Sequence, residues 1–366
     1  MIVKLDDVCE RASSSIKQSD VIGKSGNYPI YGAAGYIGNV DFYHQEKPYV
    51  AVVKDGAGIG RTMLLPAKSS VIGTMQYLIP KPSISAEYLR YVVQHMNLEK
   101  YYSGATIPHI YFRDYKEEQF NLSSQVEQAH IVGALKKVEE IIEKRQQQLS
   151  ALDDLIKARF VEMFGDPKVN EKHWDEGVVS DFFDVKGGKR IPKGMDYSDE
   201  ITVHPYLRAT DMKNETILDD DIHYIGEDVF QHIKRYTVQG GDIYLTNVGV
   251  NLGMAGVIPE KYSGANLTEN AVKLVPKTNK FRGIFIANYI NSPGIQDYIN
   301  ERKMAVGVPK LAIFRIETMP LIIPPIEKQD AFAIFRVQID KSKSVIQKSL
   351  DETQLLFDSL MQKYFG

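Results

Sequence analysis

The chain has 366 residues, which is enough for about two or three domains of ordinary size. Apolar residues make up 43% and charged residues 25% of the chain, a balance that excludes disorder throughout. The formal net charge of −3 means that a nucleic-acid-binding protein of this composition would have to gather its cations on one face.

The N-terminal residues Met1–Asp7 lack the apolar core of a signal peptide. The sequence holds no run of about 18 or more apolar residues, so we expect no membrane span. Cys9 is the only cysteine, which excludes an internal disulfide and a cysteine-rich zinc site and fits a reducing compartment. We therefore expect a cytoplasmic protein.

Residues 1–125 are expected to form a β-rich globular unit, because glycine, proline and asparagine separate short apolar runs. The apolar run Tyr49–Val53 leads into the glycine-rich stretch Lys54–Gly60. A dinucleotide or S-adenosylmethionine loop would open directly into a helix at this point. Residues 61–66 are instead typical of a strand that ends at a proline. We therefore predict a tight β-turn rather than a cofactor loop.

Residues 126–165 are expected to form one long helix. Their apolar side chains recur mostly at three- and four-residue steps, no proline interrupts them, and Gly133 is the only glycine inside. About 38 helical residues would span roughly 57 Å. The sequence Gly165-Asp166-Pro167 then predicts an abrupt end of the helix.

Residues 166–325 and 326–366 repeat this arrangement. Residues 107–165 and 308–366 align without a gap at an offset of 201, the difference between Pro309 and Pro108, and the alignment also pairs Gln128 with Gln329. Residues 89–93 and 284–288 are both expected to form a short helix. A long helix with one apolar stripe needs a partner, and a coiled coil of the two repeats is favoured over ordinary core packing. The predicted fold class is α+β, with two mixed α/β units in tandem, each followed by a long helix.

Motifs of enzyme chemistry are missing from the sequence. The eight histidines are scattered without a metal-binding pair, and no Walker loop, nucleophile elbow or Asn-Pro-Pro-Tyr/Phe methyltransferase signature occurs. The acidic run Asp219–Asp221 is better explained as a solvated turn than as a cation site. We therefore expect no catalytic residue, no metal and no cofactor.

Several short segments carry side chains suited to reading DNA. Residues 186–193 hold four cations and no acid, with glycines that let the backbone approach a phosphate. Residues 206–211 include an arginine suited to guanine, and residues 246–251 offer amides suited to adenine. Each of these residues taken alone could equally well be an ordinary solvent-exposed side chain. The prediction of DNA contact rests on the recurrence of such residues at matched places in the two halves. The predicted DNA-contacting residues are Lys54, Arg61, Thr62, Thr106, His109, Tyr111, Arg113, Lys186, Lys189, Arg190, Lys193, Arg208, Thr210, Thr246, Asn247, Asn251, Lys303 and Lys310.

The chain resembles the specificity subunits of type I restriction-modification systems over essentially its whole length. The segments that carry the resemblance are Tyr-Leu-Arg-Ala-Thr-Asp-Met at 206–212, Gly-Asp-Ile-Tyr-Leu-Thr at 241–246, Val-Pro-Lys-Leu at 308–311 and Ile-Pro-Pro-Ile-Glu-Lys-Gln at 323–329. The repeated copy at 122–128 lacks both prolines, and the first unit has no clear counterpart of residues 206–211.

This resemblance implies two target-recognition domains, residues 1–125 and 166–325, held apart by antiparallel spacer helices at 126–165 and 326–366. Each domain would read one half of a bipartite, asymmetric site on double-stranded DNA. The helices would fix the gap and dock two methyltransferase (modification) subunits, which restriction subunits then join. Methylation and cleavage would belong to those partners, so the resemblance implies a non-catalytic chain.

Two other functions stay open at this stage. One is a single-chain DNA methyltransferase or nuclease with an unrecognised motif. The other is a repeat-built scaffold protein without a nucleic-acid role.

Overall fold

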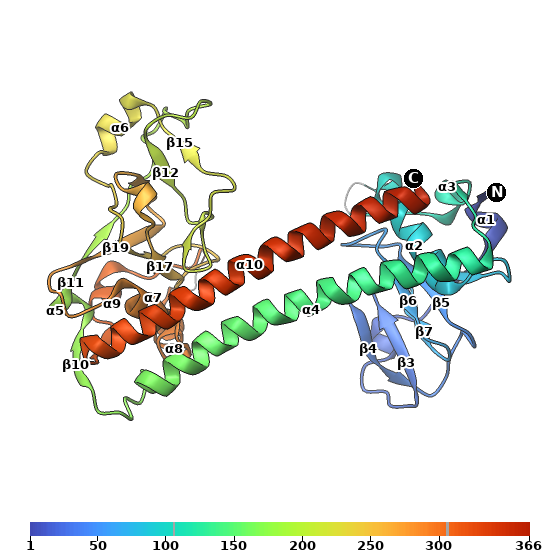
Figure 1. Ribbon diagram of the computed structural model, residues 1–366, viewed down its shortest axis with the longest axis horizontal. Helices are drawn as coiled ribbons and strands as arrows, with labels where there is room; N and C mark the ends of the chain where they lie inside the picture. The colour runs from blue at the N-terminus through green and yellow to red at the C-terminus, as the bar shows by residue number, and fades with distance from the viewer. Residues whose placement is uncertain (105–106, 305–306) are drawn as a thin grey trace. The chain divides into compact units, whose positions relative to one another are not determined.

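The computed structural model describes residues 1–104, 107–304 and 307–366, which form two compact units (Figure 1). Unit 1 comprises Met1–Gln147 together with Gln347–Gly366, and unit 2 comprises Gln148–Ile346. Each of the two long helices, α4 (Gln125–Phe164) and α10 (Ile326–Phe365), therefore contributes one part to each unit. Within the described residues, no helix is both long enough and apolar enough to span a bilayer.

Unit 1 is built on a four-stranded antiparallel sheet in the order β2-β8-β5-β6, a three-stranded sheet β4-β3-β7 and the strand pair β1-β9. Helix α2 (Ala86–His95) packs on the four-stranded sheet and is capped by the Ser85 hydroxyl. The other elements are β1 (Ile2–Lys4), α1 (Leu5–Val8), β2 (Cys9–Ser13), η1 (Gln18–Asp20), β3 (Tyr28–Gly32), β4 (Gly35–Val40), β5 (Tyr49–Val53), β6 (Thr62–Leu65), β7 (Ser70–Val71), β8 (Met75–Pro80), η2 (Leu98–Tyr101), α3 (Phe112–Tyr115) and β9 (Gln119–Asn121).

Unit 2 has a four-stranded sheet in the order β11-β19-β16-β17, a three-stranded sheet β15-β12-β18 and the pairs β10-β20 and β13-β14. Helix α7 (Gly283–Asn291) packs on its four-stranded sheet. The other elements are β10 (Asp175–Val178), α5 (Val179–Phe182), β11 (Phe183–Gly187), β12 (Pro205–Leu207), β13 (Met212–Lys213), β14 (Thr216–Ile217), β15 (His223–Tyr224), α6 (Glu227–Ile233), β16 (Ile243–Thr246), β17 (Ala255–Val257), η3 (Glu260–Tyr262), β18 (Asn266–Leu267), β19 (Ala271–Pro276), α8 (Pro293–Arg302), α9 (Ile313–Glu317) and β20 (Pro320–Ile323).

The two units share one topology, so the predicted repeat is confirmed and extends over the whole chain. Strands β2, β8, β5 and β6 of unit 1 correspond in order to β11, β19, β16 and β17 of unit 2. Both three-stranded sheets contain one parallel pair, which joins Ile30 to Ser70 in unit 1 and Tyr206 to Asn266 in unit 2. Among the described residues, the β13-β14 hairpin and α6 are additions of unit 2. Both predicted short helices lie within α2 and α7.

In unit 1, the apolar stripe at the start of α4 packs against the last turns of α10. Ile131 and Leu135 share one buried cluster with Phe357 and Phe365. The Phe365 ring also meets the ring of Tyr88 on α2 edge-on, with centroids 5.3 Å apart. The cluster therefore joins both long helices to the sheet-packed helix of unit 1.

In unit 2, the end of α4 packs against the start of α10. Phe160 and Phe164 have ring centroids 5.4 and 5.7 Å from that of Phe332, and Phe164 meets Phe285 of α7 at 4.8 Å. The contact of Phe164 with Phe285 is the repeat counterpart of that of Phe365 with Tyr88. Since the start of each helix meets the end of the other, the predicted antiparallel pairing is confirmed.

One buried glutamine fixes the first turn of each long helix to the loop before the sheet-packed helix. In unit 1 the Gln128 Oε1 accepts from the Ser85 amide at 3.1 Å, and its Nε2 donates to the carbonyl oxygens of Ser83 and Ser123. In unit 2 the Gln329 Oε1 accepts from the Arg282 amide at 2.9 Å, and its Nε2 donates to the carbonyl oxygens of Lys280 and Pro324. This repeat pair of the sequence is therefore a pair of equivalent structural contacts.

Replacing Gln329 with alanine should destabilise unit 2 by about 1–3 kcal/mol, because the buried amide and carbonyl groups lose their partners. The matched control is Gln338→Ala, an exposed position of the same helix, where a change within about 0.5 kcal/mol is expected. Denaturant unfolding of both variants checks this. Equal stability of the two variants would contradict a structural role for Gln329.

Candidate nucleic-acid interface

In unit 2, the turn that follows β16 is bonded through its backbone to two other loops. The Asn247 amide donates to the Asn270 carbonyl oxygen at 3.0 Å, and the Gly249 amide donates to the Pro309 carbonyl oxygen at 2.9 Å. The Leu311 amide returns a bond to the Asn247 carbonyl oxygen at 2.8 Å. These bonds bring residues 247–253, 268–271 and 307–311 to one edge of the unit.

Unit 1 has an equivalent edge, which equivalent backbone hydrogen bonds hold together. The Lys54 amide donates to the Thr74 carbonyl oxygen at 3.0 Å, the Gly56 amide donates to that of Pro108 at 2.9 Å, and the Ile110 amide donates to that of Lys54 at 3.0 Å. We refer to residues 54–60 with 107–110 in unit 1, and residues 247–253 with 307–311 in unit 2, as the loop pair of each unit. The sequence signal for this equivalence was the Pro108/Pro309 match.

The glycine-rich stretch of unit 1 is a hairpin turn, as predicted. Strands β5 and β6 pair antiparallel on either side of it, so no helix begins there. Gly56 has φ +87° and its counterpart Gly249 has φ +101°, left-handed conformations that glycine adopts without a steric penalty. A cofactor phosphate would therefore find no helix N-terminus at this loop.

The basic segment 186–193 lies along the same edge of unit 2. The Gly188 amide donates to the Ala271 carbonyl oxygen at 3.1 Å, and the Lys189 amide donates to that of Leu267 at 2.8 Å. A Cβ at Gly188 would lie 2.0 Å from the Thr268 carbonyl oxygen, so only glycine permits this approach. These bonds hold Gly188 and Lys189, in the middle of the basic segment, at the edge that carries the loop pair.

The cations of the unit 2 edge differ in how far they are committed to other groups. Arg190 pairs with Glu269 at 2.8 Å, Lys186 lies 3.7 Å from an Asp184 oxygen, and the Lys303 ammonium donates to Asn300 at 2.7 Å. Lys189, Lys193 and Lys310 are exposed and have no ion-pair partner within 1–104, 107–304 and 307–366, and the Lys189 ammonium lies 6.0 Å from the Tyr236 ring centroid. Among the predicted cations of unit 2, Lys193 and Lys310 therefore have the fewest bonds to other groups.

The unit 1 edge carries a stack of cationic and aromatic groups. The His109 Nδ1 lies 2.6 Å from the Asp55 carboxylate, and the His109 ring stacks with that of Tyr111. The Arg113 guanidinium lies 4.8 Å from the Tyr111 ring centroid and is exposed, while Lys54 lies 3.6 Å from Asp55. The structure therefore brings four of the predicted unit 1 residues together.

The remaining unit 1 candidates lie nearby or outside the described residues. The Arg61 guanidinium donates to the Ala33 carbonyl oxygen at 3.3 Å and is exposed, and Thr62 is half-buried in β6. Thr106 lies outside the described residues.

Two candidates in the unit 2 turn are buried, so their geometry favours a structural role over base contact. Thr246 is fully buried, and its hydroxyl donates to the Asn251 carbonyl oxygen and accepts from the Met254 amide at 3.0 Å. Asn247 is 5% exposed, and its Nδ2 donates to the Leu311 carbonyl oxygen at 3.3 Å. These two side chains shape the turn, and the half-buried Asn251 at its tip stays a candidate for base contact.

Arg208, predicted to reach guanine, is bonded within the unit instead. Its Nη2 donates to Asp211 at 2.7 Å and to Asp221 at 2.8 Å, and its Nη1 lies 3.1 Å from His223 Nε2. The hydrogen bond from Arg208 lowers the pKa of Asp221, and the bond to Asp211 raises the pKa of Arg208. The guanidinium would have to leave these partners to contact a base, whereas the neighbouring Thr210 is exposed.

Unit 1 has no clear sequence counterpart of residues 206–211, but it has a positional one. Residues 30–35 occupy that place, because β3 pairs in parallel with β7 as β12 does with β18. Gly32 stands where unit 2 has Arg208. Sequence comparison missed the match because only Ala33 and Ala209 are identical. It also missed residues 268–271, to which both the turn and the basic segment bond.

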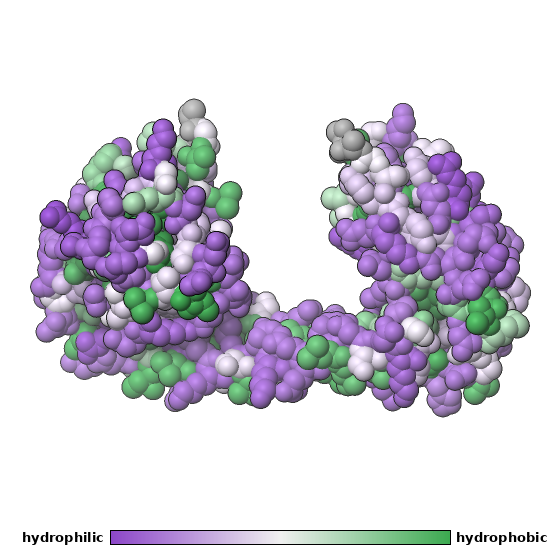
Figure 2. Space-filling model, turned by 90° about the horizontal axis from the view of Figure 1, so that it is seen from above, coloured by the Kyte–Doolittle hydropathy of each residue, from purple (hydrophilic) through white to green (hydrophobic). Residues whose placement is uncertain are grey.

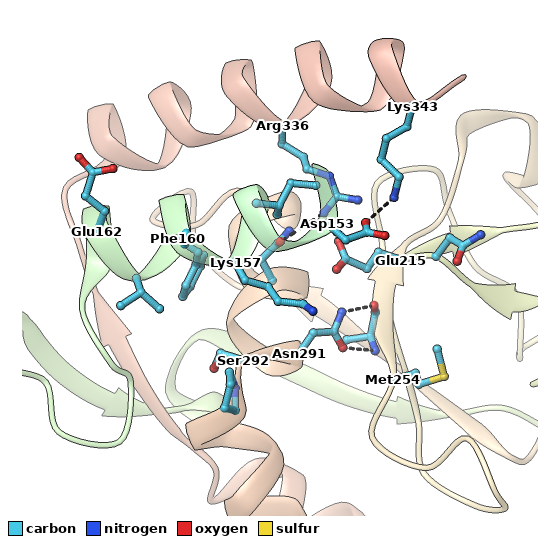
Figure 3. A pocket seen from close by; sticks show the side chains of 17 residues that line it. Asp153, Lys157, Phe160, Glu162, Glu215, Met254, Asn291, Ser292, Arg336 and Lys343 are labelled. Atoms are coloured by element: carbon cyan, nitrogen blue, oxygen red, sulfur yellow. Dashed lines mark hydrogen bonds and ion pairs between the residues drawn. The ribbon is translucent and has the colours of Figure 1, made fainter. Parts of the chain in front are cut away.

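A cavity of about 990 Å³ lies in unit 2 (Figure 3). Its charged side chains are in ion pairs: Lys343 pairs with Asp153 at 2.5 Å, and Arg336 pairs with Glu215 and with Asp340. No group of three metal-binding side chains occurs among the described residues. The charged groups that line the cavity therefore already have partners.

The single cysteine does not supply a nucleophile. Cys9 is buried and donates to the Leu5 carbonyl oxygen at 3.2 Å. Burial raises the pKa of its thiol to about 12, so the reactive thiolate is scarce at neutral pH.

On the face seen in Figure 2, the surface of each unit is mainly hydrophilic with scattered apolar side chains.

Comparison with known proteins gives one consistent family. The family model described as the type I restriction modification DNA specificity domain matches residues 1–151 and 171–353. The type I restriction enzyme MjaIX specificity subunit of Methanocaldococcus jannaschii is 22% identical over 210 residues, which are 52% of this chain and 48% of that protein. The match thus spans about half the length of that curated relative.

Solved structures resemble the chain along its whole length. The S subunit of a type I restriction-modification system from M. genitalium has a TM-score of 0.62 at 17% identity and covers 100% of this chain and 96% of that one. A chain from a study of complex assembly and conformational transition of the type I R-M system has a TM-score of 0.57 at 13% identity, with 100% and 97% covered. At these identities the likeness shows the fold.

Removing the Arg208 side chain should lower the stability of unit 2 by about 1–3 kcal/mol, because Asp211 is 5% exposed and would lose its cation. The matched control is Lys193→Ala, an exposed lysine of the same edge, for which a change within about 0.5 kcal/mol is expected. Thermal and denaturant unfolding measure both. If Arg208→Ala left the stability unchanged, the structural role of Arg208 would be contradicted, and its guanidinium would again be a candidate for DNA contact.

Proposed function

Because this chain belongs to the type I restriction-modification DNA specificity family, whose subunits recognise DNA without catalysis, we propose that it reads a bipartite, asymmetric site on double-stranded DNA. The observation that carries the proposal is the loop pair, which the fold builds twice with the same backbone bonds. Each unit would read one half of the site, in the cytoplasm, where cellular DNA lies.

The side chains on the two loop pairs and on the segments beside them support an asymmetric site. Unit 1 presents the His109, Tyr111 and Arg113 stack, whereas unit 2 presents Lys193 and Lys310. Base edges in the major groove are distinguished by which donors, acceptors and apolar groups face them. Two readers with one backbone and different side chains would therefore select two different half-sites.

The proposal assigns methylation and cleavage to partner subunits. Two modification subunits would dock on the α4–α10 pair and carry S-adenosylmethionine, and restriction subunits would join them with Mg²⁺ and ATP. Exposed apolar side chains on these helices, such as Leu155 and Ile334 in unit 2, support a docking role. Incubating the purified chain alone with S-adenosylmethionine and DNA should transfer no methyl group; transfer would favour a single-chain methyltransferase.

DNA binding should depend steeply on salt, since each phosphate contact releases counterions. The complex of the chain with its modification subunits should show a log–log slope that falls by about 1 for Lys193→Ala and about 1 for Lys310→Ala. The control Lys348→Ala removes an exposed lysine of α10 in unit 1 and should leave the slope unchanged. Binding that ignores salt would favour a scaffold without a nucleic-acid role.

The long helices are proposed to set the gap between half-sites, because each one continues without a break from one unit into the other. Inserting one heptad after Gln147 and one after Ile346 adds about 10.5 Å to both helices while keeping the apolar stripe in register. The spacer between half-sites should lengthen by about three base pairs at 3.4 Å each, with the half-sites unchanged. Sequencing methylated sites measures this.

The control for this experiment is the same heptad inserted after Gln147 only. It should unfold or weaken the chain, since the stripe of α4 would no longer match that of α10. A double insertion that folds and methylates DNA with the original spacer would contradict the proposed role of the helices.

A further inference from the structure

Val250 stands alone at the tip of the unit 2 loop pair. It is 98% exposed, the highest exposure among the large apolar side chains of the described residues. It occupies a turn in which the Leu252 amide donates to the Gly249 carbonyl oxygen at 3.2 Å, so Val250 and Asn251 are its two central residues. We expect a binding partner to cover an apolar side chain that is so fully exposed to water at this position.

The turn holds Val250 in a fixed place. The Gly249 amide is bonded to Pro309, the buried Thr246 hydroxyl is bonded to the Asn251 carbonyl oxygen, and the Gly253 amide donates to the Thr246 carbonyl oxygen at 2.8 Å. A side chain with one preferred rotamer on a bonded turn loses little conformational entropy when it is covered. The tip is therefore organised before any partner arrives.

The surroundings of Val250 favour nucleic acid as that partner. The loop pair places it one residue from the Gly249–Pro309 bond, Asn251 follows it in the turn, and Lys310 pairs with Val248 in an isolated antiparallel β-bridge. A cation for phosphate and an amide for a base edge therefore lie beside the apolar group. The apolar group that a base edge offers in the major groove is the C5-methyl of thymine. Valine is smaller than the Phe, Leu, Ile and Met side chains that are inserted between base steps, so contact with a base edge is favoured over insertion.

We propose that Val250 reads the C5-methyl group of one thymine in the half-site of unit 2. The inference rests on the proposed DNA-reading function and names one specificity contact within it. The methyl group and the valine cover each other, and a base without the methyl leaves Val250 in water.

Unit 1 supplies an internal comparison. The equivalent backbone bonds place Ala57 where unit 2 has Val250, because Gly56 corresponds to Gly249. The second loop differs less, since Ile107, 56% exposed, stands where unit 2 has Val308, 66% exposed. The larger apolar side chain at the tip of the first loop is thus a property of unit 2, since Ala57 carries a single methyl group, and one half of the site should depend on the larger group.

The test is a double-mutant cycle between the protein and the DNA, on the full chain assembled with its modification subunits. Once the site is mapped by sequencing methylated DNA, each thymine is replaced in turn by uracil, which lacks the methyl group. One replacement, confined to one half-site, should weaken binding by wild type about three- to fivefold. The Val250→Ala variant, whose shorter side chain covers less of the methyl group, should lose most of this preference for thymine over uracil. The matched control Val169→Ala, an exposed valine of the connector after α4, should keep the wild-type response.

Three results would overturn the inference: no replacement affects the wild type, Val250→Ala keeps the full response, or Val250→Ala loses its modification subunits because a protein covers the valine. In each of these results the unmodified duplex still shows whether site-specific DNA binding occurs. Absence of that binding in wild type would refute the proposed function itself, so the two failures are distinguishable.

Discussion

The apolar stripes of two 40-residue helices have to be removed from water, and the architecture follows from how this is done. Neither helix would be stable alone, because most helical stability in water comes from packing an amphipathic face. Each stripe is covered partly by the other helix and partly by a helix that lies on a sheet. Phe365 against Tyr88 and Phe164 against Phe285 are the two copies of the second contact. Folding of the helices and folding of the two units are therefore linked.

On this scaffold, the backbone is conserved between the two repeats while the exposed side chains diverge. The bonds from Gly56 to Pro108 and from Gly249 to Pro309 fix one loop geometry in both units. The residues at the tip of the loop are Ala57 in unit 1 and Val250 in unit 2. They can differ because neither takes part in the hydrogen bonds that fix the loop geometry. A protein that must read two different half-sites is well served by this separation of a fixed frame from variable contacts.

The sequence predicted the helices well and the site only in part, for physical reasons. Helical periodicity over 38 residues is a strong signal, and the aligned Gln128 and Gln329 make equivalent buried contacts in the structure, although the sequence match did not predict burial. Base-reading chemistry was assigned from residue type alone. That criterion does not separate exposed Lys310 from buried Thr246 or from Arg208, which its own unit holds. Sequence comparison could not find the counterpart of residues 206–211, because the two repeats share the pairing of their strands there but not the identity of their side chains.

The central claim is that the two loop pairs face the two halves of one DNA site. Photocrosslinking tests it most directly: a photoreactive residue is placed at Ala57 or at Val250, in the assembled complex on its mapped site, and the crosslinked bases are sequenced. Ala57 is expected to crosslink to bases of one half-site and Val250 to bases of the other. Crosslinks from both positions to the same half-site, or to no base at all, would contradict it.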